Sequence, residues 1–346
     1  VNLQGERLRF FGVVTDVALA STDPAMRLTP ADVSNPFVAS VVSGTAAYGT
    51  IAVEPSLALR VDSFEALDGP QPAKTVPPHF SEASLASEED IQLIFGSEDE
   101  RHFWIGNPLD METKLCLDIQ ELVKRSNGVF GKSGTGKTFL TRLLLIGILQ
   151  SGAATNLVFD MESEYGWKGY VEGAAEVKGL KQLFSSKVAV FSLDEESSKR
   201  RGLTPDYVVR IGLDEIEPED VQVLGSMWDL SDIAIEAAFS LERHFGSRRW
   251  LSEFLDLKGR EALQEVAGAI GVPQGTLNAL HNRLTRLKRF DFIDEASGHD
   301  SVGQILSYLD RGIHVVLEFG RYGSDLAAYI LVANLLTRRI YERYQR

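Results

Sequence analysis

The chain has 346 residues, of which 44% are hydrophobic and 24% charged, a composition typical of globular proteins with two or three domains. Its 35 basic and 49 acidic residues give a net charge of −14, which argues against a protein that coats nucleic acid over its whole surface. No apolar run approaches the roughly eighteen residues of a membrane span. The one cysteine, Cys116, excludes a disulfide framework and fits a cytoplasmic location.

Residues 1–80 predict a β-rich domain. Runs of Val, Phe, Leu and Ile at 10–17, 36–42 and 48–61 are separated by Gly, Pro, Asn and Ser, and no long helical period is present. Short strands of this kind favour a small barrel or sandwich. Pro77 and Pro78 then predict a linker.

Strands and helices alternate in the next part of the chain. A helix is expected at 84–95, followed by strand-like pieces at 103–105 and 114–117. From about residue 126 the pattern predicts an apolar helix at 138–150 and buried strands, which span 128–130, 156–160, 188–192 and 314–318. Such alternation is typical of an α/β fold with a mostly parallel sheet.

The alternation stops between residues 202 and 300. Pro218 followed by two acids predicts a helix start, and leucines recur at helical spacing from Leu277 to Leu287. We interpret this segment as a helical insertion. The expected organisation is a barrel at 1–80, a core at 81–201, the insertion at 202–300 and the rest of the core at 301–346.

One motif carries the chemistry. Residues 131–138 read G-K-S-G-T-G-K-T and fit the phosphate-binding pattern G-x-x-x-x-G-K-[ST] completely. Its glycines let backbone N–H groups turn inward around a phosphate at the head of a helix. Lys137 is expected to reach the β- and γ-phosphates of ATP and Thr138 to bind Mg²⁺. The residues expected to hold the nucleotide are Gly131, Lys132, Ser133, Gly134, Thr135, Gly136, Lys137, Thr138 and Phe139. A chance match is disfavoured by the strand predicted before the motif and the helix after it.

A second acidic cluster follows the next predicted strand. Asp160 and Glu164 lie in the run D-M-E-S-E-Y, and ligand sites of such sheets form at the carboxyl ends of strands. Both acids are therefore expected to face the crevice of the phosphate loop. Asp160 is a candidate magnesium ligand, and either acid is a candidate for orienting the attacking water. The alternative is a solvated acidic turn.

These features together resemble the HerA family of the HerA/FtsK superfamily. The resemblance rests on the β-rich start, the Pro-Pro linker, the phosphate loop and D-x-x-x-E-Y, where Ser163 replaces the family's glycine. It implies a RecA-like core, an N-terminal HAS-barrel, a helical-bundle insertion and a homohexameric ring that moves along double-stranded DNA. It also implies a partner, either a NurA-type nuclease or a defence effector. The family's basic residue before the loop, which reaches a neighbouring subunit's nucleotide, matches Arg125.

The sequence also departs from the family in its Walker B strand. The family's Walker B strand, with its catalytic Glu, follows the helix that matches residues 324–345, so this strand is expected to be absent from the sequence. The strand at 314–318 also ends in an acid, Glu318, but its order in the chain makes it the preceding strand. Glu318 is therefore a weak catalytic candidate.

Three basic clusters are candidate contacts for DNA phosphates, and each has the alternative of a solvated surface. They are Arg283 with Arg286, Lys288 and Arg289; Lys199 with Arg200 and Arg201; and Arg248 with Arg249. Residues 265–287 also resemble a helix-turn-helix, although bundle packing is the favoured interpretation. The leading function is thus an ATP-driven DNA translocase. The alternatives are an ATP-regulated ring that assembles and activates a bound nuclease or NADase, a protein or conjugation pump, and a small-molecule kinase.

Overall fold

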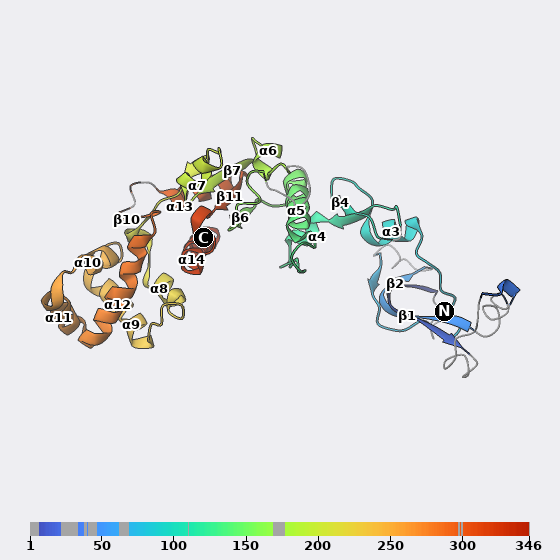
Figure 1. The fold of residues 1–346 in the computed structure, drawn as a ribbon, viewed down its shortest axis with the longest axis horizontal. Helices are drawn as coiled ribbons and strands as arrows, with labels where there is room; N and C mark the ends of the chain where they lie inside the picture. The colour runs from blue at the N-terminus through green and yellow to red at the C-terminus, as the bar shows by residue number, and fades with distance from the viewer. Residues whose placement is uncertain are drawn as a thin grey trace. The chain divides into compact units, whose positions relative to one another are not determined.

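The computed structural model describes residues 7–21, 34–37, 40, 47–61, 69–109, 111–168, 177–296, 298 and 300–345. The chain divides into two compact units, Val1–Asp118 and Ile119–Arg346, and Figure 1 labels most of their helices and strands. No helix in the described part of the chain combines the length and the apolar character needed to cross a membrane.

An antiparallel sheet forms the first part of the N-terminal unit. Strand β1 (Leu8–Ser21) pairs with β2 (Ala47–Arg60), which also pairs with the short β3 (Gln71–Pro72). The strands expected at 10–17 and 48–61 are confirmed. The strand expected at 36–42 is wrong where it is described, because Pro36 and Phe37 are helical; residues 38, 39, 41 and 42 lie outside the described residues. The barrel or sandwich stays a prediction.

The rest of this unit is a helix and a hairpin. Helix α3 (Glu88–Phe95) begins four residues later than expected because Ser87 caps it: the Asp90 N–H donates to the Ser87 hydroxyl (3.2 Å) and the Ser87 N–H to the Asp90 carboxylate (2.9 Å). Strands β4 (His102–Gly106) and β5 (Leu115–Asp118) pair antiparallel, which confirms the two strand-like pieces of the sequence.

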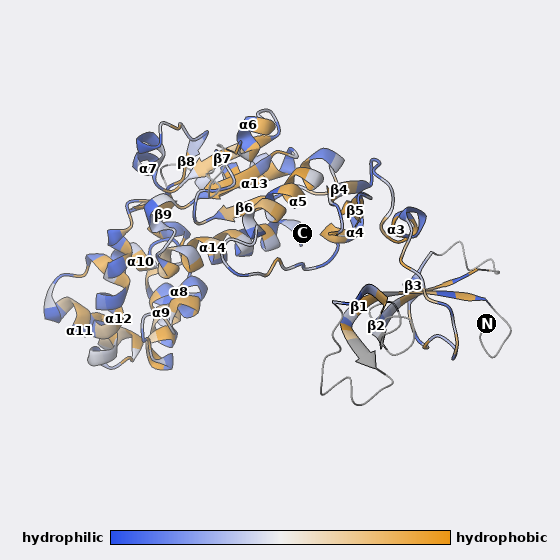
Figure 2. Ribbon diagram, turned by 45° about the vertical axis from the view of Figure 1, so that its right-hand side comes forward, coloured by the Kyte–Doolittle hydropathy of each residue, from blue (hydrophilic) through white to orange (hydrophobic). Residues whose placement is uncertain are grey.

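A parallel sheet organises the C-terminal unit. Its strand order is β6-β11-β7-β8, with β6 at Leu157–Asp160, β11 at His314–Glu318, β7 at Val188–Ser192 and β8 at Tyr207–Val208. The expected α/β core with a parallel sheet is confirmed. In Figure 2 strands β6 and β7 are largely orange, and β7 is buried along its whole length.

Alternate residues of β7 and β11 pack into two separate cores. Phe191 and Leu317 join the large core with the C-terminal helices, whereas Val190 and Val316 join Leu149 of α5 (Lys137–Ser151) on the other face. Helices therefore cover both faces of the sheet, as parallel strands require. The other elements beside the sheet are α4 (Ile119–Val123), α6 (Leu180–Leu183), α7 (Glu195–Arg200), α13 (Ser301–Asp310), η4 (Gly320–Tyr322) and α14 (Leu326–Tyr344).

The strand expected at 128–130 is wrong. Residues 126–130 belong to no strand, and Phe130 is 91% exposed. Apolar residues predict an extended segment, but a strand also needs a neighbour that accepts its hydrogen bonds. None of the strands in the described residues runs along this segment.

Helices dominate residues 213–289, as the sequence predicts. Pro218 occupies the first turn of α8, and Leu277, Leu280, Leu284 and Leu287 are fully buried. These helices share the large core with β7 and β11, so the segment packs against the α/β core. Its elements are η2 (Leu213–Glu215), α8 (Pro218–Leu224), α9 (Asp232–Phe245), α10 (Trp250–Asp256), α11 (Gly259–Ile270), α12 (Gln274–Leu284) and η3 (Thr285–Arg289), flanked by the paired strands β9 (Ile211–Gly212) and β10 (Ile293–Asp294).

Candidate nucleotide-binding site

The phosphate loop leads directly into α5. Gly134 and Gly136 adopt the left-handed conformation, with φ of 80° and 88°, and Gly136 is the N-cap of the helix. Side chains other than glycine rarely adopt this conformation. The glycines at these two positions therefore let the chain turn tightly at the positive end of the helix dipole.

Two side chains fold back over the loop. The Lys137 ammonium donates to the carbonyl of Lys132 (2.8 Å), and so does the Thr135 hydroxyl (2.7 Å). A Cβ at Gly131 would lie 2.5 Å from the Thr135 hydroxyl, so glycine is needed there for close packing. Lys137 forms no ion pair with the residues that the structure describes. A phosphate, as an anion, is a stronger acceptor than this neutral carbonyl.

The loop fits a nucleotide with Mg²⁺. Its backbone amides lie at a helix N-terminus, which is a ready-made anion site. The Thr138 hydroxyl, on the first turn of α5, makes no hydrogen bond within the described residues and is free to ligate a metal. Phe139 is half-exposed at 52%. With ATP bound, Lys137 would contact the phosphates and Thr138 would hold the metal.

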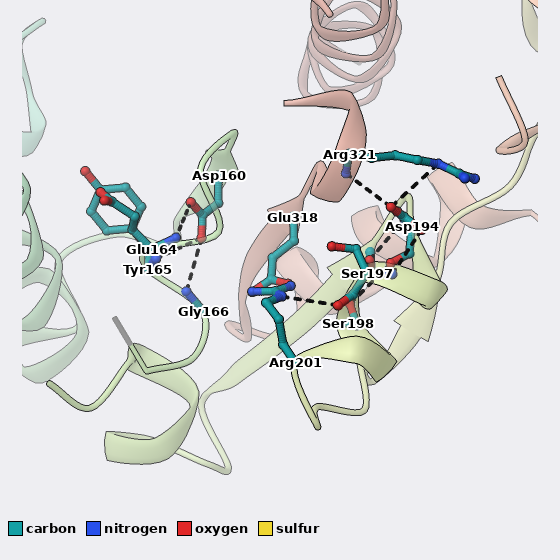
Figure 3. Close-up of polar contacts among 11 residues, drawn as sticks. Asp160, Glu164, Tyr165, Gly166, Asp194, Ser197, Ser198, Arg201, Glu318 and Arg321 are labelled. Carbon is teal, nitrogen blue, oxygen red and sulfur yellow. Dashed lines mark hydrogen bonds and ion pairs between the residues drawn. The ribbon is translucent and has the colours of Figure 1, made fainter. Parts of the chain in front are cut away.

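Asp160 organises the turn that follows β6. Its carboxylate is 1% exposed and accepts three backbone N–H groups, from Glu164 (2.9 Å), Tyr165 (2.8 Å) and Gly166 (3.3 Å), as Figure 3 shows. Burial raises the pKa of Asp160, and the three N–H donors act in the opposite direction. Both carboxylate oxygens thus already have partners. The magnesium role of Asp160 stays a prediction, and contact through a water is the form that this geometry allows.

Ser163 adopts a backbone conformation that favours glycine. Its φ is 55°, in the left-handed region. A residue with a Cβ is strained in this conformation.

Helix α5 holds this turn. The Arg142 guanidinium is buried at 5% exposure and donates to the carbonyl of Glu164 (2.5 Å). The preceding residue, Thr141, hydrogen-bonds with the Tyr165 hydroxyl, whose pKa is raised chiefly by burial. No hydrogen bond joins Asp160 or Glu164 directly to residues 131–138 in the described structure. The two expected halves of the site are connected through α5 instead.

Glu318 is a buried ion-pair partner. It ends β11, is 0% exposed and pairs through Oε2 with Arg201. Its other oxygen, Oε1, has no hydrogen-bond partner and lies against Gly166, where a Cβ would be 2.9 Å away. Burial raises the pKa of Glu318, and Arg201 opposes that change. Glu318 remains a weak catalytic candidate, because its charge is already matched.

Arg125 lies before the phosphate loop and is exposed. Its guanidinium forms no ion pair with any described residue, whereas the neighbouring Lys124 pairs with Glu121 (2.6 Å). An unpaired exposed arginine is suited to reach another molecule. Its role across a subunit interface stays a prediction.

Sequence reasoning missed the roles of Arg142 and Arg201. Arg142 interrupts an otherwise apolar helix face in F-L-T-R-L-L-L-I-G-I-L, which is a usable signal because a charge inside such a run needs a specific partner. Arg201 carries no such signal. Its partner Glu318 is 117 residues away along the chain.

Comparison with known proteins identifies the family. No match was found among curated proteins. The family model described as "Helicase HerA, central domain" matches residues 103–340, a range that contains the phosphate loop, the acidic turn after β6 and the whole parallel sheet. The chain therefore belongs to the HerA/FtsK family of P-loop ATPases.

Proposed function

We propose that this ATPase is one subunit of a hexameric ring motor that moves along double-stranded DNA, beside a partner nuclease or a defence effector. The observation that carries the proposal is the glycine-turned loop at the head of α5, inside a HerA central domain. A loop of this geometry binds phosphate groups, and the family is one of ATP-driven motors.

Each side chain has a proposed task. Bound ATP with Mg²⁺ supplies a phosphoryl group that is transferred to water. Lys137 neutralises charge on the phosphates and Thr138 positions the metal. Glu164 and Asp160 orient the attacking water from the turn after β6. Arg125 of one subunit approaches the nucleotide of the next and stabilises the developing charge.

A DNA-stimulated ATPase assay tests the proposal. Turnover is measured with and without linear duplex DNA for the wild type, for Lys137→Ala and for Lys258→Ala, an exposed lysine on the helical segment. We expect DNA to stimulate the wild type and the control, and Lys137→Ala to lose turnover. Normal turnover in Lys137→Ala would refute the assigned site. Sedimentation with and without ATP tests the ring: a monomer in both conditions at micromolar concentration contradicts it.

A second candidate function is an ATP-regulated scaffold ring that assembles and activates its partner without continuous movement. The net charge of −14 favours it, because a negatively charged ring that encircles DNA is repelled by the DNA phosphates. Slow turnover that DNA does not change, measured with the partner present, would select the scaffold over the translocase.

A further inference from the structure

A basic stretch lies in this acidic chain at residues 274–289. It holds Arg283, Arg286, Lys288 and Arg289 and no Asp or Glu, although the whole chain carries −14. They form α12 and η3, whose leucines are fully buried. The burial of the apolar side fixes the basic side at the surface.

A pocket lies at the end of this stretch. Its volume is about 530 Å³, and its lining brings together residues from η3, η4 and the start of α14. Three of the lining residues are arginines. One aromatic side chain comes from η4 and another from the segment between α8 and α9. The residues that matter here are Trp228, Arg286, Arg289, Arg321, Tyr322 and Asp325.

Arg286 is the arginine of the pocket that has no ion-pair partner among the described residues, and it is exposed. Arg289 and Arg321 do have partners: Arg289 pairs with Asp325 (2.9 Å), and Arg321 pairs with Asp291 and, at 3.6 Å, with Asp194. The net positive charge that is free for a ligand is therefore centred on Arg286.

The pair of Arg289 with Asp325 is exchangeable. The side chain of Arg289 is 51% exposed, and exposed ion pairs contribute little to stability. Asp325 also has a separate task, because its Oδ1 caps α14 by accepting the N–H groups of Ala327 (3.0 Å) and Ala328 (3.2 Å). It keeps that task when Arg289 turns to another anion.

We infer that this pocket binds a backbone phosphate of duplex DNA, with Arg286 as the principal contact and Arg289 as the second. The inference rests on the proposed action on DNA and locates one of its contacts. Guanidinium groups present paired donors that match phosphate oxygens. Lys288 pairs with Asp256 (3.4 Å), but Arg283, three residues before Arg286, forms no ion pair with any described residue. A second cation next to Arg286 along the chain suits a polymer of phosphates better than a small anion.

Salt-dependent binding tests the inference. Binding of a fluorescein-labelled 40-bp duplex is followed by anisotropy across a salt series for the wild type, Arg286→Ala and Arg286→Ala/Arg289→Ala. Each lost phosphate contact should weaken binding by about tenfold and reduce the slope of log K against log salt by about one. Arg248→Ala/Arg249→Ala, a basic pair outside the pocket lining, is the matched control and should keep the wild-type slope. Turnover without DNA and the melting temperature of Arg286→Ala should match the wild type.

The outcomes separate the two proposals. A wild type that fails to bind the duplex at 50 mM salt overturns both the action on DNA and this pocket. A wild type that binds, with an unchanged slope in Arg286→Ala, overturns the pocket alone. An equal loss in the Arg248→Ala/Arg249→Ala control also overturns it, because the contacts would then be spread over the surface.

Discussion

Glu318 of β11 lies directly opposite Asp160 of β6 in the parallel register, and both carboxyl groups are buried at the same edge of the sheet. Burial raises the pKa of both, and the charge of Asp160 raises the pKa of Glu318 further. They are stabilised differently: Asp160 by three backbone N–H groups and Glu318 by the guanidinium of Arg201. The edge of the sheet next to the acidic turn therefore depends on both sets of partners.

Arg201→Met should destabilise the C-terminal unit because it leaves Glu318 buried without a counter-charge. Arg201 is about one third exposed, so we expect a loss of about 2–3 kcal/mol, below the value for a fully buried pair. An acid whose folded pKa is raised contributes stability at low pH that is lost as pH rises through that pKa. Urea unfolding should therefore show a larger loss at pH 8 than at pH 5. The neighbouring exposed Arg200→Met is the control, and an equal loss at both pH values would contradict the assignment.

Asp160→Ala should remove the acceptor of three backbone amides at once. Since a buried donor left unsatisfied costs about 1–3 kcal/mol, we expect a loss of roughly 3 kcal/mol or more in urea unfolding. Glu162→Ala, on the exposed part of the same turn, should change stability by less than about 0.5 kcal/mol. If Asp160→Ala instead lost ATP turnover at unchanged stability, the carboxylate would act on the metal and not on the turn.

Ser163→Gly should stabilise the protein. Position 163 has φ of 55°, where a residue with a Cβ is strained by about 1 kcal/mol relative to glycine. The melting temperature should be highest for Ser163→Gly, lower for the wild type and lowest for Ser163→Val, because a β-branched side chain is more strained in this conformation. The opposite order would mean that the serine hydroxyl compensates for the strain.

Arg125→Ala should slow ATP turnover by about tenfold or more while nucleotide binding persists, because an arginine that reaches a neighbouring site acts on the transition state. Lys124→Ala is a matched control one residue away, and its ammonium is already paired with Glu121. Turnover and binding of a fluorescent ATP analogue are measured for both. Equal turnover in the two variants removes Arg125 from the mechanism.

The elements that sequence predicts well are those set by local chemistry. Strand β7 matches its expected bounds, α5 begins within one residue of its expected start, and Pro218 opens α8. Buried apolar runs, glycine turns and a proline at the start of a helix can all be recognised within about fifteen residues of sequence. The phosphate loop belongs to this class.

The features that sequence did not predict depend on distant partners. Residues 126–130 look like a strand, yet strand formation is decided by a neighbour elsewhere in the chain. Glu318 resembles the acid of a catalytic strand until its pairing with Arg201 is known. Asp160 is identified as important by its position, but its three amide partners follow from the shape of the turn. The local sequence pattern identifies such residues, but their role depends on tertiary contacts that the pattern does not contain.

The anchoring of the acidic turn by Arg142 has a mechanical consequence. The same helix begins at Lys137 and, five residues later, holds the carbonyl of Glu164 through Arg142. The phosphate loop and the backbone of Glu164 are thus both attached to α5, so their spacing is set before a nucleotide binds. A site prepared in this way spends little free energy on rearrangement when the reaction begins.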